Sequence, residues 1–562
     1  MKTRTVRFFV WAEKIEPSPF SWHASCNERT GVTTMRTIIR PRARRAQLFL
    51  LVLPLLFSAG AGGQGPPAPL ALSLDDCIAQ AVRKNLGVAV QVYGFRLAES
   101  AVVRAAEKFI PSLSLDYYRD SRNSASYSWI EAADIVSTNA RTYSAGLSQA
   151  IPFGGTLSLG LGTGRNFSNS LFQTINPRYS GSLSFSFAQP LLKDFGWTTS
   201  RKEILVARNS RDMAENDLRA TLLETVHSVE QSYWELVYRI ESLKVQRQSL
   251  KLAENLLDKS RKEAEIGTLA PKEVISAQAE VASRQADILQ AGMMVRDSAD
   301  ALRGLIRLPF DKDAPDIVPA DEPAFVKSGL GLDEALALAL RNRPDLRSSA
   351  LGVKNKELDY SYAKNQTLPA LSLNAQYWSP GLSGDRILFL DNNPLTGIVV
   401  GRVPGGANQA VRDALHFKYS NWSVSLSLDV PLSSVFTRAA LAQARDSLDL
   451  EVVRMKQREQ AAVIEIRAAV RAVETNYERV LARKTARELA EEKLAAEEAK
   501  LKVGLSNNYF VLNYQRDLAA ARTAELRALV DYTLSLGLLD KATGTSLEKR
   551  NIKLADAAEV QR

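Results

Sequence analysis

One opening motif occurs twice in this chain of 562 residues, and that internal repeat restricts the folds available to it. LSLDDCIAQAVRKNLGV spans residues 72–88, and LGLDEALALALRNRPDL spans residues 330–346. In both stretches acidic residues lead into apolar residues spaced three and four apart, which predicts the start of an amphipathic helix. A chain that starts twice in this way is expected to consist of two similar halves.

After each helical start the sequence changes to small polar residues that alternate with apolar ones. Runs of about 9–11 residues with this alternation predict tilted strands that cross a bilayer and turn one polar face inward. A soluble β-sandwich would show the same alternation, but so few strands among so much helix favour a membrane sheet. The runs are 110–118, 143–151, 156–164, 179–189, 368–378 and 419–430. Aromatic residues near their ends fit interfacial girdles: Tyr117, Tyr118, Tyr143, Tyr179, Tyr377, Trp378, Tyr419 and Trp422.

Very long helices follow the strands in both halves. The stretch from Arg201 to Ile266 contains neither proline nor glycine, and its apolar residues alternate spacings of four and three. This heptad pattern predicts a coiled-coil rod on the order of 100 Å long. Each rod is expected to end at a glycine turn, within 265–282 and 502–519, and then to double back. The heptad residues are Leu222, Val226, Val229, Tyr233, Leu236, Ile240 and Leu243, and Val463, Ile466, Val470, Val473, Tyr477 and Val480.

The amino-terminal region has the pattern of a secretory signal peptide over residues 35–61. Basic residues after Met35 precede an apolar core, Leu48–Phe57, and the small residues Ala59-Gly60-Ala61 follow. The pattern predicts cleavage after Ala61, and an uncleaved anchor is the alternative. Residues 1–34 are interpreted as an upstream extension or a mis-assigned start. The core is too short for a spanning helix, and no later run of about 18 apolar residues predicts one.

The basic net charge does not indicate a nucleic-acid partner. Of the formal net charge of +10, residues 1–61 contribute +7, from ten Lys/Arg and three Asp/Glu. The rest of the chain is therefore close to neutral and offers no extended basic surface.

The residues that catalysis and metal binding require are sparse. The histidines are His23, His227 and His416, and the cysteines are Cys26 and Cys77. A site built from His and Cys is excluded by this count, and no nucleophile elbow or phosphate-binding loop is present. We therefore expect no enzyme activity, no metal and no cofactor. Cys77 lies in a predicted helix and is expected to be a small buried side chain.

The two halves suggest a division into repeats with a proline-rich crossing. The first repeat is expected over residues 72–308, with helix, strands and long hairpin, and the second over 330–545. The connection 309–329 contains four prolines, which indicates a linker. The tail 546–562 is charged and lacks an apolar face, so we expect it to be loosely ordered.

Taken together, these motifs resemble the TolC-type outer-membrane efflux family over residues 72–545. The resemblance is carried by the doubled opening and by two strand-to-helix junctions, QPLLKDFG (189–196) and DVPLSS (429–434). Two glycine turns complete it, IGTLAP (266–271) and VGLSNN (503–508). It implies an α+β membrane protein in which a trimeric outer-membrane β-barrel continues into a long periplasmic α-helical coiled-coil barrel.

The resemblance also implies partners and a function. In such a family the homotrimer is the outer-membrane exit duct of a tripartite efflux or type I secretion system. It passively conducts substrates delivered by a periplasmic adaptor (a membrane fusion protein) and an inner-membrane pump of the RND, ABC or a similar class. A periplasmic coiled-coil adaptor and a structural envelope protein without a channel are the alternatives. An adaptor needs a membrane anchor and compact β-domains, and a coiled coil without a channel leaves the amphipathic strands unexplained.

The same resemblance assigns site residues at the helical turns. The adaptor-docking tips would comprise Gly267, Thr268 and Leu269 in the first half and Gly504, Leu505 and Ser506 in the second. The glycines would permit the reversal in either case. Family members often close the periplasmic entrance with carboxylates just past the tips. Here the corresponding residues are Glu273, Phe510 and Asn513, which implies a partly apolar constriction.

The number of strands is left with two interpretations. The first half contains one more alternating hairpin than the family's usual plan, around Pro152-Phe153-Gly154-Gly155. If 143–151 and 156–164 join the wall, a trimer has eighteen strands instead of the family's usual twelve. If they fold against the base or lumen, the count stays at twelve. Their length and alternation favour the wall.

Overall fold

The structure is a computed structural model that describes residues 70–126, 131, 133–170, 173–311 and 315–554. These residues belong to one compact unit, Gly65–Arg562. The expected upstream extension 1–34, the signal peptide 35–61 with its cleavage after Ala61, and the end of the tail lie outside the described residues.

Each half opens with a short helix that leads into a longer one. The first pair is α1 (Leu74–Lys84) and α2 (Leu86–Ala106), and the second is α6 (Leu332–Asn342) and α7 (Pro344–Gln366). Ser73 caps α1 in a capping box with Asp76, which fixes its start. The predicted openings are confirmed, whereas the longer second helices were not predicted from the sequence.

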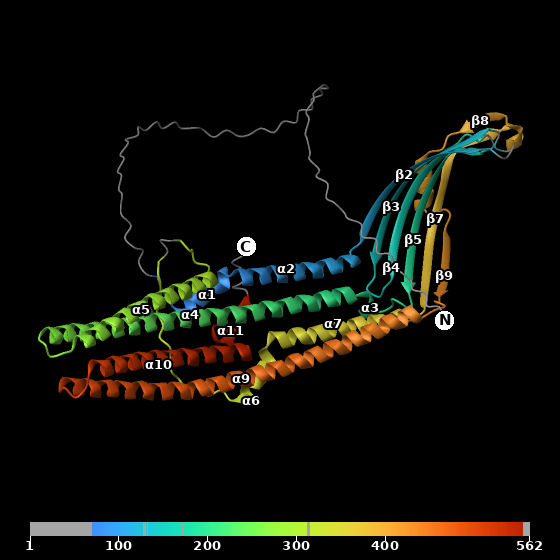
Figure 1. Cartoon of the computed structure of the whole chain (residues 1–562). Coiled ribbons are helices and arrows are strands. Elements are labelled where there is room, and N and C mark those ends of the chain that lie inside the picture. Colours follow the sequence, from blue (N-terminus) through green and yellow to red (C-terminus); the bar gives the residue numbers. More distant parts are fainter. Residues whose placement is uncertain (1–69, 127–130, 132, 171–172, 312–314, 555–562) are drawn as a thin grey trace, which may run out of the picture. The chain divides into compact units, whose positions relative to one another are not determined.

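Seven of the described strands form one curved antiparallel sheet (Figure 1). Its order is β2-β3-β4-β5-β7, and β7 pairs on its far side with β8 at one end and with β9 at the other. The bounds are β2 (Ser112–Ala125), β3 (Ile135–Ala150), β4 (Thr156–Ser168), β5 (Ile175–Pro190), β7 (Ala370–Phe389), β8 (Val399–Val403) and β9 (Asn421–Asp429).

All six predicted strand segments are present in this sheet, which differs from the prediction in the length of its strands and in one additional short strand. The hairpin of β3 and β4 belongs to the ladder between β2 and β5, as its alternation favoured. Most strands run beyond the predicted 9–11 residues, because pairing continues into polar sequence such as 119–125, where the alternation has already ended. The short β8 was not predicted, because five residues carry too little periodicity.

The two faces of the sheet differ sharply in chemistry. On β5, for example, Ser180, Ser182, Ser184 and Ser186 alternate with apolar residues such as Leu183 on the other face. Strand register extends the serine- and glycine-rich face over β3 and β4, whereas on β7 the same face carries Gln376, Trp378 and Leu382. Both faces match the pattern expected of strands with one side toward lipid and one toward water.

A short helix, α8 (Ala407–Leu415), lies against the apolar face of this sheet. It is packed so closely on β5 and β7 that a Cβ at Gly181 or Gly381 would overlap the carbonyl oxygen of Ala410. The ring of Phe417, just after α8, stacks 6.4 Å from that of Phe185. Glycines at paired positions of neighbouring strands therefore make the space for this helix.

One antiparallel hairpin of long helices completes each half (Figure 1). The hairpins are α4 (Lys202–Glu265) with α5 (Pro271–Ile306), and α9 (Val435–Lys502) with α10 (Asn508–Thr543). Most predicted heptad residues are buried, including Leu222, Val229, Tyr233, Ile466 and Val480, so the predicted rods are confirmed. Short helices occupy Glu107–Phe109, Trp197–Ser200, Leu390–Asn392 and Pro394–Thr396.

The linker 309–329, which connects the two halves, is bonded to the rest of the chain near both of its ends. Its strand β6 (Ile317–Pro319) pairs in parallel with β1 (Leu70–Leu72). Tyr233 of α4 bonds the linker on one side, and Tyr532 of α10 receives the backbone N–H of Ser328 on the other. Burial raises the pKa of Tyr233 to about 12, so its hydroxyl stays protonated and able to donate at neutral pH.

The expectation of a loose tail is wrong for residues 546–554. A short helix, α11 (Ser546–Lys549), follows α10, and Arg550 forms an ion pair of 2.6 Å with the buried Glu230. Leu547 and Ile552 pack on the apolar cluster around α1 and α4. The sequence did not show this order, because a few apolar residues at irregular spacing give no helical periodicity.

Tyr233→Phe is expected to loosen the linker, at a cost of about 2 kcal/mol in stability. The hydroxyl accepts backbone N–H bonds from Ala320 (3.2 Å) and Asp321 (3.1 Å) and donates to the Leu72 carbonyl, so its loss leaves buried groups unpaired. Faster amide hydrogen exchange over 315–322 would show it. Tyr238→Phe is the control, because the Tyr238 hydroxyl bonds nothing among the described residues; equal exchange in both variants would contradict the assignment.

Candidate functional site at the helical tips

The first tip is a glycine-terminated helix end with its carbonyl groups satisfied. Gly267 has φ +82°, and its N–H bonds the carbonyl of Ala264 at 3.0 Å. The N–H of Thr268 bonds the carbonyl of Glu263 at 2.9 Å, and the Thr268 hydroxyl reaches the same oxygen. These two backbone bonds form a Schellman motif, which ends α4 and reverses the chain.

The second tip repeats the same geometry in the other half. Gly504 has φ +77°, and its N–H bonds the carbonyl of Leu501 at 3.2 Å. The N–H of Leu505 bonds the carbonyl of Lys500 at 2.9 Å. The two halves therefore end their long helices in one motif, with an apolar side chain directly before each glycine and residues 268 and 505 directly after it.

The tips differ in what they expose. Leu505 is 79% exposed, and Ile266 on the first tip is 77% exposed, whereas Leu269 is half-buried. The hydroxyl of Ser506 donates to Glu497 at 2.6 Å, which ties the turn back to its own helix. Exposed apolar side chains on turns this rigid are typical of a surface that another protein covers.

The three expected constriction residues lie in the first turns that follow the tips. Glu273 occupies the third position of α5, where the positive end of the helix dipole stabilises its carboxylate. Phe510 is exposed at the start of α10, beside the ring of Tyr509 at 5.7 Å, and Asn513 is half-buried one turn later. Among the described residues no hydrogen bond or ion pair joins Glu273 to Phe510 or Asn513.

Beneath the tips the two hairpins pack into one apolar cluster. All four long helices contribute to it, with Leu257, Ala277, Leu494 and Val511 among its members. Asn508 of α10 donates across to Ser260 of α4 at 2.8 Å, and both side chains are buried. The hairpins of one chain are thus joined close to their ends by packing and by a buried hydrogen bond.

A buried arginine forms the second connection between the hairpins. Arg284 of α5 is 4% exposed and donates to the Ser249 carbonyl of α4 at 2.6 Å and to the Leu512 carbonyl of α10 at 3.2 Å. It also pairs with Glu280 at 3.0 Å, and Glu280 in turn binds Arg516 of α10 at 2.6 Å. One guanidinium therefore bridges three helices.

The charge of Glu280 is maintained by these arginines. Its partial burial would raise the pKa of the carboxyl, but the hydrogen bonds and charges of Arg516 and Arg284 outweigh burial and lower that pKa. The group therefore stays ionised at neutral pH, and the pairs persist.

Sequence reasoning missed this network, although a signal was present. Ala277, Val281 and Arg284 follow the heptad spacing of four and three, so a charged residue stands where the apolar seam of α5 continues. A charge at a seam position indicates a buried polar partner. The partners themselves come from α4 and α10 and could not be read from local spacing.

A family model described as "Outer membrane efflux protein" matches residues 155–306 and 335–545, more than half of the chain. The antibiotic efflux pump outer membrane protein ArpC of Pseudomonas putida is 23% identical over 494 residues, which cover 86% of this chain and 91% of ArpC. Outer membrane protein TolC of Vibrio cholerae is 23% identical over 66% of this chain and 79% of TolC.

Solved structures share the fold. The CmeC outer membrane channel of Campylobacter jejuni matches with a TM-score of 0.62 and 14% identity, covering 86% of this chain and 90% of CmeC. The open-state MtrE outer membrane channel of Neisseria gonorrhoeae matches with a TM-score of 0.58 and 18% identity, covering 85% and 90%. With its doubled helix–strand–hairpin plan and its amphipathic sheet, this chain belongs to the outer membrane efflux protein family and is an outer-membrane channel for efflux.

Proposed function

We propose that three copies of this chain form a passive exit duct, in which the sheets close a barrel and the long helices continue it into the periplasm. The observation that carries the proposal is the sheet itself. One face is lined by serine and glycine, and the other exposes apolar residues such as Leu115, Val424 and Leu426. An apolar sheet face of this extent is stable when lipid covers it.

The edges of the sheet support closure by neighbouring copies. Within the described residues β2 and β9 each have one strand partner, so each leaves a row of backbone N–H and C=O groups unpaired. In lipid these groups need partners, and β9 of one copy against β2 of the next would supply them. Six long strands from each of three chains would then give an eighteen-stranded barrel, wider than one of twelve.

The exposed apolar face of helix α2 is a second observation that supports a trimer. With its short extension it spans Leu86–Phe109 and is long and apolar enough to cross a membrane by length and composition, yet few of its residues are buried. Its exposed side chains include Leu86, Val90 and Leu97. In a trimer this face would pack on the helices of the neighbouring copy, which explains an apolar helix with so little cover in one chain.

The tips are the proposed docking site of a periplasmic adaptor. The two Schellman turns hold Gly267, Thr268 and Leu269, and Gly504, Leu505 and Ser506, in fixed conformations at the end of the rods. Glu273, Phe510 and Asn513 would narrow the entrance just inside the tips. ArpC is named for the efflux of antibiotics, and the outer membrane protein TtgC of Pseudomonas putida, another relative, is named for the efflux of toluene. We infer that the inner-membrane pump selects the cargo and that the duct conducts it.

Reconstitution of the purified protein in planar bilayers tests the duct. We expect stepwise ion conductance, together with recovery of the protein in the outer-membrane fraction after separation from inner membranes. Conductance larger than that of a twelve-stranded relative in the same salt would support the wider barrel. Recovery in the inner membrane, or bilayers that stay silent, would contradict the proposal.

A further inference from the structure

Three arginines stand side by side on the apolar face of the sheet. Arg119 of β2 is the register partner of Arg141 of β3, which is the register partner of Arg165 of β4. All three are exposed, and none forms an ion pair within the described residues. Directly opposed side chains on neighbouring strands lie about 5 Å apart at Cβ, so three like charges in a row repel one another.

This arginine row, Arg119–Arg141–Arg165, borders the apolar band. Two residues along each strand, about 7 Å away, the same face carries Tyr117, Tyr143 and Thr163. The rings of Tyr117 and Tyr143 lie 5.0 Å apart, as in an interfacial aromatic girdle. The row therefore lies where the lipid headgroups of the leaflet farther from the long helices would be.

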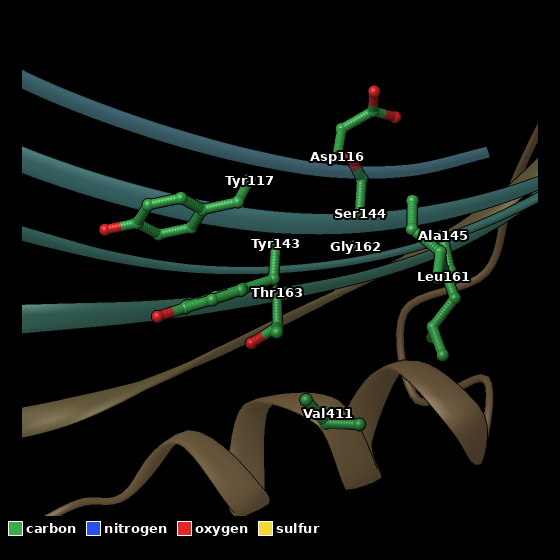
Figure 2. A pocket seen from close by; sticks show the side chains of 10 residues that line it. Asp116, Tyr117, Tyr143, Ser144, Ala145, Leu161, Gly162, Thr163 and Val411 are labelled. Atoms are coloured by element: carbon green, nitrogen blue, oxygen red, sulfur yellow. The ribbon is translucent and has the colours of Figure 1, made fainter. Parts of the chain in front are cut away.

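An apolar groove begins directly beside the row. It has a volume of about 400 Å³ and is lined on the sheet by Leu115, Tyr117, Tyr143 and Leu161, while Val411 of α8 closes it from the other side. Figure 2 shows Leu161 pointing toward α8 and Asp116 pointing away, to the polar face. A groove of this size fits part of a small apolar molecule, such as an acyl chain.

We propose that the arginine row and this groove bind a phosphorylated lipid of the outer leaflet, with its phosphate on the guanidinium groups and an acyl chain in the groove. Guanidinium groups bind phosphate through two parallel hydrogen bonds, and a phosphate between them would offset their mutual repulsion. The helix α8 fits the same depth, because its small residues Ala410 and Ala414 pack on the sheet and polar residues such as Asn408 and Arg412 remain for the headgroup layer. The inference rests on the proposed barrel, whose apolar face meets lipid.

Native mass spectrometry of the purified assembly with bisphosphorylated lipid A tests the site. Arg119→Gln/Arg141→Gln/Arg165→Gln is expected to lower the bound fraction by roughly tenfold or more, since at least two charge-assisted hydrogen bonds are lost. Ala145→Trp should also lower it, because the indole fills the groove without removing a charge. Arg122→Gln/Arg178→Gln is the matched control, with both arginines on the polar face of the same sheet, and should bind as the unmodified protein does.

Two further binding measurements distinguish a lipid phosphate from free phosphate. Dephosphorylated lipid A should bind the unmodified protein much more weakly, and inorganic phosphate alone should not displace the lipid, because it cannot fill the groove. Equal binding of both lipids, or full binding by the triple arginine variant, would overturn the proposal. If that variant does not assemble, the comparison of the two lipids on the unmodified protein decides. Conductance of the same preparation tests the duct separately, so failure of one inference is distinguishable from failure of the other.

Discussion

Gly504→Val is expected to abolish export while the protein still assembles in the outer membrane. Gly504 adopts φ +77°, where a β-branched residue is strained by about 1–3 kcal/mol, although no neighbouring atom would clash with its Cβ. The turn would therefore rearrange and move Leu505, the most exposed apolar residue of that tip. Since α9 has 68 residues, the tip lies about 100 Å along the rod from the sheet, and the barrel should not sense the change.

The effect is measured as the export of a known cargo by cells that lack the wild-type protein and produce the variant instead. We expect a fall to the level of cells without any duct, with normal amounts of protein in the outer membrane. Gly292→Val is the matched control, because Gly292 lies within α5 at an ordinary helical φ with open space around it. Gly504→Asn should retain most export, since asparagine tolerates the left-handed conformation. Normal export by the valine variant would refute a docking role for this tip.

Arg284→Ala is expected to separate the two hairpins near their tips, at a local cost of about 3 kcal/mol. The change leaves the carbonyl groups of Ser249 and Leu512 without this donor in a buried site. Glu280 keeps its pair with Arg516 but loses the buried partner. The expected sign is therefore destabilisation, confined to the ends of the hairpins.

Amide hydrogen exchange of the assembled protein reports this local opening. Faster exchange is expected in α5 and α10 around residues 277–284 and 508–516, while the sheet keeps its protection. Arg516→Ala is the control, because its side chain is 62% exposed and an exposed pair contributes at most about 1 kcal/mol. Unchanged exchange at the tips in Arg284→Ala would show that packing of the apolar cluster alone joins the hairpins.

Much of the fold could be predicted because its signals are local and periodic. The repeated openings, the heptads through Leu222 and Ile466, and the glycines at 267 and 504 each determine a structure within a few residues. Alternation likewise located every long strand. The positions of both glycine turns therefore follow from the sequence, and the structure adds that the turns share one hydrogen-bond pattern.

Other features depend on contacts between distant segments and could not be read from spacing. The order of residues 546–554 arises from Arg550 meeting Glu230 across the chain, and the partners of Arg284 come from α4 and α10. The heptad spacing marks Arg284 as a charge in the apolar seam, but it identifies neither the partners of Arg284 nor that of Arg550. Burial of a charge depends on which helices surround it, and that is a property of packing.

The arginine row shows most clearly which features the sequence determines and which depend on the tertiary structure. By itself the sequence determined that the chain has two halves, amphipathic strands and long helical hairpins, because binary pattern and turn residues act over short range. Arg119, Arg141 and Arg165 look unrelated in the sequence, where more than twenty residues separate each from the next. Strand register, which depends on the pairing of β2, β3 and β4 along their whole length, aligned the three charges on one face. A slip of one residue would have turned each onto the other face, so the tertiary structure alone decided that they lie in one row.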